Sequence, residues 1–410
     1  MTMANFQKVK VGDLLEKVKG QKKVPKGDYL AFGKYKIIDQ GDSESFGFCN
    51  DPDLLYKGPM PVIIFGDHTC RIKFIKTQFC LGADGTQLMF TNKIDQTYFY
   101  YALKGLSFKI SAYQRHYKLI KEKTILYPEK KEAQIRIASV LSAYDDLIEN
   151  NEKRIKALEE MAQLLYTEWF VKFNYPRLRQ GFLLRNCCGG QVGGQADNEK
   201  MKMVDSGTEY GMVPEGWVVK MLDDLIQPQY GFTTSAIDKT AGVQFLRGMD
   251  INKTSYIDWS SVPYCDIEAS NNKKYAIKKG DIFIIRMADP GKIGICEKQV
   301  DAVFASYLMR LQIKSRLTNY YLFYYLISNK YQNFVVGSSS GTTRKSINSK
   351  QVGTINILVP DQNTLENFEE KISLLRSRIT NHLDQNQNLT KTRDLLIPQL
   401  VTGKRILKGL

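Results

Sequence analysis

The sequence predicts an α+β protein in which two pseudo-symmetric α/β blocks are separated by two long antiparallel coiled-coil helices. Three observations predict this fold. A stretch of 45 residues, 129–173, contains neither proline nor glycine and is bounded by Pro128 and Pro176. Its apolar residues recur with a period near 3.5, as they do in a helix that packs lengthwise on another helix. The same pattern returns 231 positions later.

The first long helix is expected over residues 129–173. At 1.5 Å per residue it would form a rod of roughly 65 Å, which a domain of about 100 residues is too small to bury. We therefore interpret it as a spacer, although a long helix buried in one large α/β domain stays an alternative. Its seam consists of Ile137, Leu141, Tyr144, Ile148, Asn151, Ile155, Leu158, Ala162, Leu165 and Trp169. Polar Asn151 is typical of a residue that fixes the register of paired helices.

The second seam matches the first position for position. Subtracting 231 places each of its nine residues on a residue of the first seam: Phe368, Ile372, Leu375, Ile379, His382, Asn386, Leu389, Arg393 and Leu396. Because this seam is more polar, we expect the two helices to pack on each other within one chain, antiparallel, and to hold the blocks apart. Pairing between two chains stays open.

The segments outside the helices repeat as well. The aromatic run YFYYAL from Tyr98 corresponds to YLFYYLI from Tyr321 in the second copy, and both are expected in the core. The polar loop SAYQRHYK corresponds to GSSSGTTRKS, and the segment KTILYP corresponds to NILVP. This order predicts a first block at 1–128, a first helix at 129–175, a glycine-rich linker at 176–213, a second block at 214–360, and a second helix with a C-terminal tail at 361–410.

Charge is unevenly distributed along the chain, whose net charge is +15. The first block carries 20 basic and 12 acidic side chains, the second 18 and 12, and residues 129–173 carry 7 and 9. Positive charge on two blocks favours a polyanion contacted at two places; a merely solvated basic surface is the alternative.

The location expected for the chain is the cytoplasm. No apolar segment opens the sequence, and its apolar runs, such as PVIIF, are too short to span a membrane. The seven cysteines form no CxxC pair and read as reduced thiols. A zinc site at His68, Cys70 and Cys80 is disfavoured, and no metal is expected.

Several catalytic signatures are missing. GSSSGTTRKS lacks the lysine of a GxxxxGK[ST] phosphate loop, and no GxGxxG or GxSxG string occurs. The nearest string to the (N/D)PP(Y/F) tetrapeptide of adenine methyltransferases is NDPD from Asn50. The PD…(D/E)xK nuclease pattern fails because Leu55 stands where the acid is needed. These failures indicate a binding protein without catalytic residues.

The phrase QIRIASVLSAYDDLIENNEKRIKALEEMAQLLYTEWF, from Gln134, on the duplicated frame of block and helix, carries a resemblance to a known family. Over essentially its full length, the chain resembles the DNA-specificity subunit of type I restriction–modification systems, and the phrase from Gln134 is similar to the first spacer of that family. PEGW after YGMV resembles the entry into its second recognition domain, and LLIPQLVTGKRIL, from Leu395, resembles its C-terminus. PVIIFGDHT and FLRGMDI…GDIFIIR are also family-like. The glycine-rich stretch from Cys187 to Gly194 departs from the family by its length.

The resemblance implies a function and partners. Each block would be a target-recognition domain that reads one half of a bipartite sequence in double-stranded DNA. The helices would set the distance between the halves and dock two methyltransferase subunits, which restriction and translocase subunits join. S-adenosylmethionine, ATP and Mg²⁺ would bind to the partner subunits, which would also methylate a flipped adenine. No cofactor would bind this chain. The rival interpretations are a stand-alone methyltransferase or nuclease with diverged motifs, and a tandem RNA-binding scaffold.

Candidate DNA contacts are polar and basic residues on loops, because such side chains read base edges and hold phosphates. In the first block they are His68, Thr69, Arg71, Gln114, Arg115, His116, Tyr117 and Lys118. In the second they are Tyr230, Thr233, Thr234, Arg286, Lys292, Thr342, Thr343, Arg344 and Lys345. For each of them a solvated loop residue is the alternative.

Overall fold

The structure is a computed structural model that describes residues 5–18, 22–41, 47–83, 85–107, 115–175, 202–237, 242–251, 254–338 and 345–407. The chain divides into two compact units. The first unit is Met1–Asn150 with Gln385–Leu410, and the second is Asn151–Asp384. Within the described ranges, no helix is both long and apolar enough to cross a membrane.

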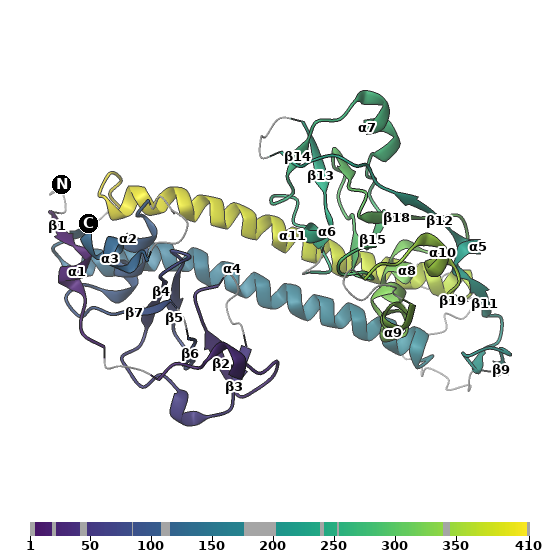
Figure 1. Ribbon diagram of the computed structural model, residues 1–410, viewed down its shortest axis with the longest axis horizontal. Helices are drawn as coiled ribbons and strands as arrows, with labels where there is room; N and C mark the ends of the chain where they lie inside the picture. The colour runs from purple at the N-terminus through teal and green to yellow at the C-terminus, as the bar shows by residue number, and fades with distance from the viewer. Residues whose placement is uncertain are drawn as a thin grey trace, which may run out of the picture. The chain divides into compact units, whose positions relative to one another are not determined.

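The two predicted long helices are present (Figure 1). Helix α4 spans Lys131–Tyr166 and continues as a π-helical turn over Thr167–Val171; helix α11 spans Gln362–Val401. Each helix is shared between the units, because the division falls at residue 150 in α4 and at residue 384 in α11. The helices are therefore not a separate spacer body, since each half belongs to the compact unit of one block.

The first block has three small sheets. Strand β1 (Phe6–Lys10) pairs with β8 (Thr124–Pro128), β2 (Tyr35–Ile38) lies between β3 (Gly47–Cys49) and β6 (Cys80–Leu81), and β4 (Val62–Gly66) lies between β5 (Ile72–Ile75) and β7 (Thr86–Met89). The helices are α1 (Val11–Leu14), α2 (Gln96–Lys104) and α3 (Tyr117–Glu122), with 3₁₀ turns at Lys26–Asp28 and Pro52–Leu54. All five residues of β4 are buried, as a continuous apolar run predicts.

The second block repeats this plan. Strand β11 (Val218–Met221) pairs with β19 (Asn356–Val359), β13 (Val243–Leu246) lies between β14 (Tyr264–Cys265) and β17 (Ala302–Phe304), and the four-stranded sheet has the order β12 (Ile226–Tyr230), β18 (Leu308–Ile313), β15 (Ile282–Ile285), β16 (Ile293–Ile295). Its helices are α5 (Leu222–Leu225), α6 (Gly248–Ile251), α7 (Ala269–Tyr275), α8 (Asn319–Ile327), α9 (Asn329–Ser338) and α10 (Ser349–Gly353).

Strand pairing establishes the repeat. The central strands β2 and β13 each have one antiparallel and one parallel neighbour. The central strands β4 and β15 each have two antiparallel neighbours. Strand β12 extends only the sheet of the second block and has no counterpart among the described strands of the first. The two blocks are thus copies of one topology with an added strand in the second.

The aromatic runs lie in the core, as predicted, and the structure shows that both form helices. They lie on α2 and α8, where Tyr98, Tyr101, Tyr321 and Tyr324 are all buried. The Tyr98 hydroxyl donates to the carbonyls of Leu126 (2.9 Å) and Val401 (3.1 Å). The Tyr321 hydroxyl donates to the carbonyl of Leu358. In each block the first of these tyrosines therefore ties the core helix to the strand that precedes a long helix.

The predicted linker is partly folded. Residues 176–201 lie outside the described residues, but β9 (Met203–Asp205) and β10 (Met212–Pro214) form an antiparallel hairpin. Val213 is buried, and the Tyr210 hydroxyl donates to the carbonyl of Asn356 over 2.9 Å. The hairpin thus lies at the end of the predicted linker, 176–213, after its glycine-rich part.

The seam residues face inward. Ile137, Leu141, Ile155, Phe368, Ile372 and Ile379 are buried, and Tyr144, Ile148, Leu158, Leu165, Leu375, Leu389 and Leu396 are half-buried. Polar seam residues find partners across the helix pair within the first unit. Arg393 forms an ion pair with Asp145, and the Asn386 side chain donates to the carbonyl of Ile148 over 3.4 Å. These contacts pair the helices antiparallel within one chain.

We predict that Tyr98→Phe lowers the free energy of unfolding by about 1–3 kcal/mol, because two buried carbonyls lose their donor. The matched control is Tyr127→Phe, whose hydroxyl bonds Gln7 at the surface and whose loss should cost less than about 0.5 kcal/mol. Urea unfolding followed by circular dichroism measures both. Equal losses in the two variants would contradict the role assigned to Tyr98.

Candidate nucleic-acid interface

A hairpin turn closed by equivalent backbone hydrogen bonds occurs in both blocks, although the second turn is two residues longer. In the first, the amide of Gly66 donates to the carbonyl of Arg71 (2.8 Å); in the second, the amide of Ile285 donates to the carbonyl of Lys292 (2.9 Å). The residue before each basic residue has a positive φ, 53° at Cys70 and 88° at Gly291. Arg71 and Lys292 are both exposed and occupy the same place, directly after the turn. Two candidates chosen separately from the sequence are thus structural equivalents.

The end of each polar loop is fastened to this turn. In the first block the amide of His116 donates to the carbonyl of Asp67 (2.9 Å), and the amide of Tyr117 donates to its carboxylate (2.8 Å). In the second block the amide of Ile347 donates to the carbonyl of Arg286 (2.9 Å), and the amide of Ala288 donates to the carbonyl of Lys345 (3.2 Å). The fold therefore joins the two candidate segments into one surface in each block.

Most first-block candidates lie at the surface. His68, Arg71, Arg115 and Lys118 are exposed, and Thr69 and Tyr117 are half-buried. Gln114 lies outside the described residues. The backbone amide of His68 and the hydroxyl of Thr69 bond the side chain and the carbonyl of Gln40, at 3.1 and 2.7 Å. Gln40 thereby holds the turn through both its side chain and its main chain.

His116 differs from the other candidates. It is only 1 % exposed, and its Nδ1 lies 3.0 Å from the carbonyl oxygen of Asp67. The expectation that an exposed His116 side chain contacts DNA needs correction, since this ring supports the turn from within. Its polarity and its place in a polar loop concealed this in the sequence.

Two second-block candidates, Arg286 and Tyr230, contact each other. The guanidinium carbon of Arg286 lies 4.5 Å from the centre of the Tyr230 ring, an arrangement that favours a cation over the aromatic face. The Tyr230 hydroxyl donates to the hydroxyl of Ser349 (3.0 Å) and accepts from its amide (2.9 Å). Thr233, Thr234, Lys292 and Lys345 are exposed, whereas Thr342, Thr343 and Arg344 lie outside the described residues. Arg286 and Tyr230 are thus held in place before any ligand binds.

Comparison with known proteins decides the family. The family model described as "Type I restriction modification DNA specificity domain" matches residues 3–160 and 214–388. The chain belongs to this family. Each match contains one block and most of the long helix that follows it, so the family unit corresponds to the repeat found in the sequence.

Individual members of the type I specificity family are distant from this chain. The MjaIX specificity subunit of Methanocaldococcus jannaschii is 26% identical over 294 residues, which are 70% of this chain and 61% of that subunit. The MjaVIII specificity subunit of the same organism is 22% identical and covers 99% of this chain and 94% of its own. The chain therefore spans less than two thirds of the MjaIX subunit.

A solved structure supports the fold. The type I restriction–modification S subunit from M. genitalium superimposes with a TM-score of 0.52 at 16% identity, covering 97% of this chain and 96% of that one. At this identity the similarity concerns the fold alone.

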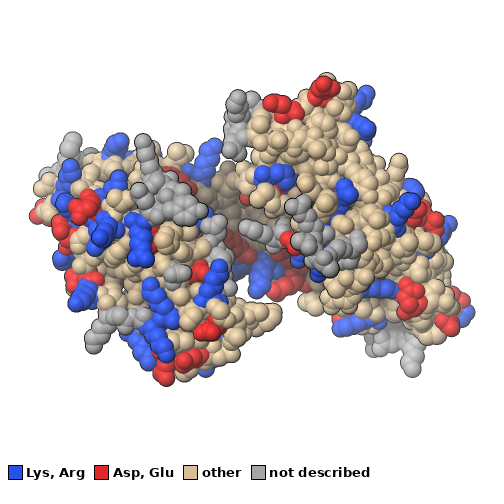
Figure 2. All heavy atoms as spheres, viewed as in Figure 1, with Lys and Arg blue, Asp and Glu red and all other residues tan. Residues whose placement is uncertain are grey.

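Lysine and arginine side chains give the candidate surface its positive charge. Figure 2 shows Lys and Arg side chains spread over the visible faces of both blocks, with Asp and Glu among them. At the first-block turn, burial and the charge of Asp67 raise the pKa of the Tyr117 hydroxyl and of the Cys70 thiol. Both groups therefore stay neutral at pH 7, and the positive charge near this turn comes from Arg71, Arg115 and Lys118.

The cysteines near the first-block turn do not gather as metal ligands. Burial, followed by the nearby Cys49, raises the pKa of Cys80 to about 12, so the thiolate that a metal needs is disfavoured. Among the described residues, no three His, Cys, Asp or Glu side chains are placed to hold an ion together.

Sequence reasoning missed the residues that support the surface. Asp67, 4 % exposed, accepts the amides of His116 and Tyr117. The Gln40 carbonyl accepts a hydrogen bond from the Thr69 hydroxyl, and the Ser349 hydroxyl accepts one from the Tyr230 hydroxyl. The only available signal for Asp67 was its place directly after a buried strand, and Gln40 and Ser349 carried no signal because their partners are distant in sequence.

We predict that Asp67→Ala releases the polar loop from the turn. The Tyr117 amide loses its partner, which costs about 1–3 kcal/mol, and hydrogen exchange at residues 115–118 should accelerate while residues 345–349 keep their rate. Asp51→Ala is the control, since Asp51 caps a surface 3₁₀ turn. Unchanged exchange at 115–118 would show that the loop is held by other contacts.

Proposed function

We propose that this chain is the DNA sequence-recognition subunit of a type I restriction–modification complex, and that each block reads one half of a bipartite target in duplex DNA. The observation that carries the proposal is the repeated joining of a hairpin turn and a polar loop, with exposed basic side chains on both. Family membership and the net charge of +15 support it. The chain then carries no active site and directs enzymes that act on adenine.

The candidate residues divide by the contacts they suit. Arg286, held against Tyr230, presents a planar guanidinium, the group that reads guanine by two parallel hydrogen bonds in the major groove. Arg71 and Lys292, at equivalent exposed places, suit phosphates, which any sequence offers. Base readers and phosphate contacts would thus lie side by side in each block.

Partner docking is assigned to the long helices. Large apolar side chains there are exposed: Leu147, Met161, Leu164, Leu374 and Leu395. Leu164 and Leu395 are 61% and 60% exposed and are separated by the repeat distance of 231 residues. Equivalent exposed leucines at two places suit two copies of one partner, the methyltransferase subunit, which restriction and translocase subunits would join. S-adenosylmethionine, ATP and Mg²⁺ would be bound by these partners, in the cytoplasm.

The decisive experiment is co-expression of the chain with methyltransferase subunits, followed by mapping of methylated adenines. We expect a bipartite motif whose halves lie about one helical turn apart, roughly 34–36 Å. A contiguous motif would contradict the proposal. So would methyl transfer or DNA cleavage by the purified chain alone, assayed with labelled S-adenosylmethionine and with Mg²⁺.

We predict that Arg115→Ala weakens binding to the target by roughly 1–3 kcal/mol if Arg115 reads a guanine, and leaves binding to random duplex unchanged. The same is expected for Arg344→Ala in the second block. Lys57→Ala, at a surface pair with Asp53, is the control. Titration of labelled target and random duplexes measures the effect. An equal loss on both duplexes would make the residue a phosphate contact.

A further inference from the structure

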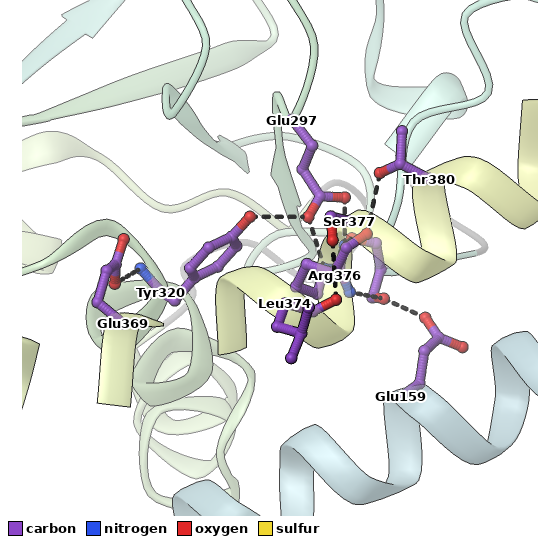
Figure 3. A network of polar contacts seen from close by, with 9 residues as sticks. Glu159, Glu297, Tyr320, Glu369, Leu374, Arg376, Ser377 and Thr380 are labelled. Carbon is purple, nitrogen blue, oxygen red and sulfur yellow. Dashed lines mark hydrogen bonds and ion pairs between the residues drawn. The ribbon is translucent and has the colours of Figure 1, made fainter. Parts of the chain in front are cut away.

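Arg376 is a buried cation on α11. Its side chain is 0 % exposed and forms a two-pronged ion pair with Glu297, with both N–O distances at 2.7 Å (Figure 3). Two further hydrogen bonds of 3.0 Å reach the hydroxyl and the carbonyl of Ser255. Burial by itself lowers the pKa of Arg376, but the ion pair with Glu297 outweighs it and raises the pKa. The guanidinium is therefore charged, and its hydrogen bonds go to Glu297 and Ser255 of the second block.

Neighbouring contacts tie the same part of the second block to both helices. The Ser255 hydroxyl also contacts the carboxylate of Glu159 on α4, and Lys298 forms an ion pair with Asp384 on α11. The Tyr320 hydroxyl donates to Glu297 over 3.2 Å, as Figure 3 shows. We call Arg376, Glu297 and Ser255 the clamp.

The first unit has a counterpart of reversed charge. Glu297 follows Lys292 by five residues, as Lys76 follows Arg71, so Lys76 is the equivalent of Glu297 in the first block. Arg376 corresponds to Asp145 at the repeat distance, and the next residue, Asp146, pairs with Lys76 over 2.9 Å. In the second unit the cation is on the long helix; in the first unit the anion is.

The two pairs differ in strength. Lys76 and Asp146 are 51% and 58% exposed, against 0% and 9% for Arg376 and Glu297. Exposed pairs contribute little, whereas breaking a buried pair leaves an uncompensated charge. A cavity of about 260 Å³, lined by Lys76, Tyr101 and Asp146 among others, also adjoins the first-unit pair. Asp145 itself turns to Arg393 and Tyr101.

We propose that Arg376 and Glu297 are positioning residues that fix the orientation of the second block on the paired helices, and thereby the register of its half-site. The orientation of the first block does not depend on its exposed counterpart pair, because a hydrophobic core packs this block on the helices. The inference rests on the proposed function for its consequence on DNA, but the clamp itself is a property of the second unit.

The test compares three variants of the full chain in complex with methyltransferase subunits. Arg376→Met removes the charge, Lys76→Met is the matched change at the exposed pair, and Arg376→Glu with Glu297→Arg exchanges the partners. Methylated adenines are mapped for each. One base pair displaces a half-site by about 3.4 Å, so spacing reports the orientation of a block. Hydrogen exchange of residues 254–258 and 296–298 reports the clamp without DNA.

We expect Arg376→Met to methylate the same two half-sites, with methylation at spacings one base pair longer or shorter raised roughly tenfold. Exchange at 254–258 and 296–298 should rise as well. Lys76→Met should retain the single spacing, and the exchanged pair should recover it in most part. If Arg376→Met does not fold, Glu297→Gln takes its place.

Wild-type spacing and exchange in a folded Arg376→Met complex would overturn the inference. An exchanged pair that recovers neither fold nor spacing would also overturn it, because the orientation would then depend on packing rather than on the ion pair. If the wild-type complex methylates no bipartite site, the proposed function fails, and the exchange measurement alone still decides the clamp.

Discussion

The width of the helix seams constrains the whole molecule. A seam of one residue per turn buries too little apolar surface for two helices to be stable by themselves, since most helical stability in proteins comes from tertiary packing. The chain meets this constraint by covering each half of the helix pair with its own block. Tyr98 and Tyr321 lie in these blocks, and their hydroxyls donate hydrogen bonds to the strands that precede α4 and α11. Helices and blocks therefore stabilise each other in each unit.

The candidate interface follows from the same repeat. A buried central strand ends at a hairpin turn, and backbone hydrogen bonds bring the end of a polar loop to that turn. These bonds use main-chain groups, so the side chains around them can differ between blocks. The first block has Asp67 and His116 where the second has Arg286 and Ile347. One backbone frame thus accommodates different side chains in the two blocks, which the proposed reading of two different half-sites requires.

The sequence was sufficient for features that depend on periodicity. The long helices, the repeat and the burial of the aromatic runs all follow from apolar patterning, which local burial determines. It was insufficient where a residue's environment depends on a distant partner. Arg376 lies beside a seam position, and a charged residue there is ordinarily assigned to solvent; only Glu297 and Ser255, far away in sequence, make its burial possible. His116 was misplaced for the same reason, because the Asp67 carbonyl that receives it is 49 residues away.

The first unit contains both ends of the chain, Met1–Asn150 and Gln385–Leu410. Ile397, Leu400 and Val401 belong to its hydrophobic core, and the Val401 carbonyl accepts the Tyr98 hydroxyl. Domains ordinarily fold in order from the N-terminus while the ribosome synthesises the chain. Here that order is reversed for completion: the second unit, Asn151–Asp384, has all its residues first, whereas the core of the first unit stays unfinished until Ile397, Leu400 and Val401 have left the ribosome.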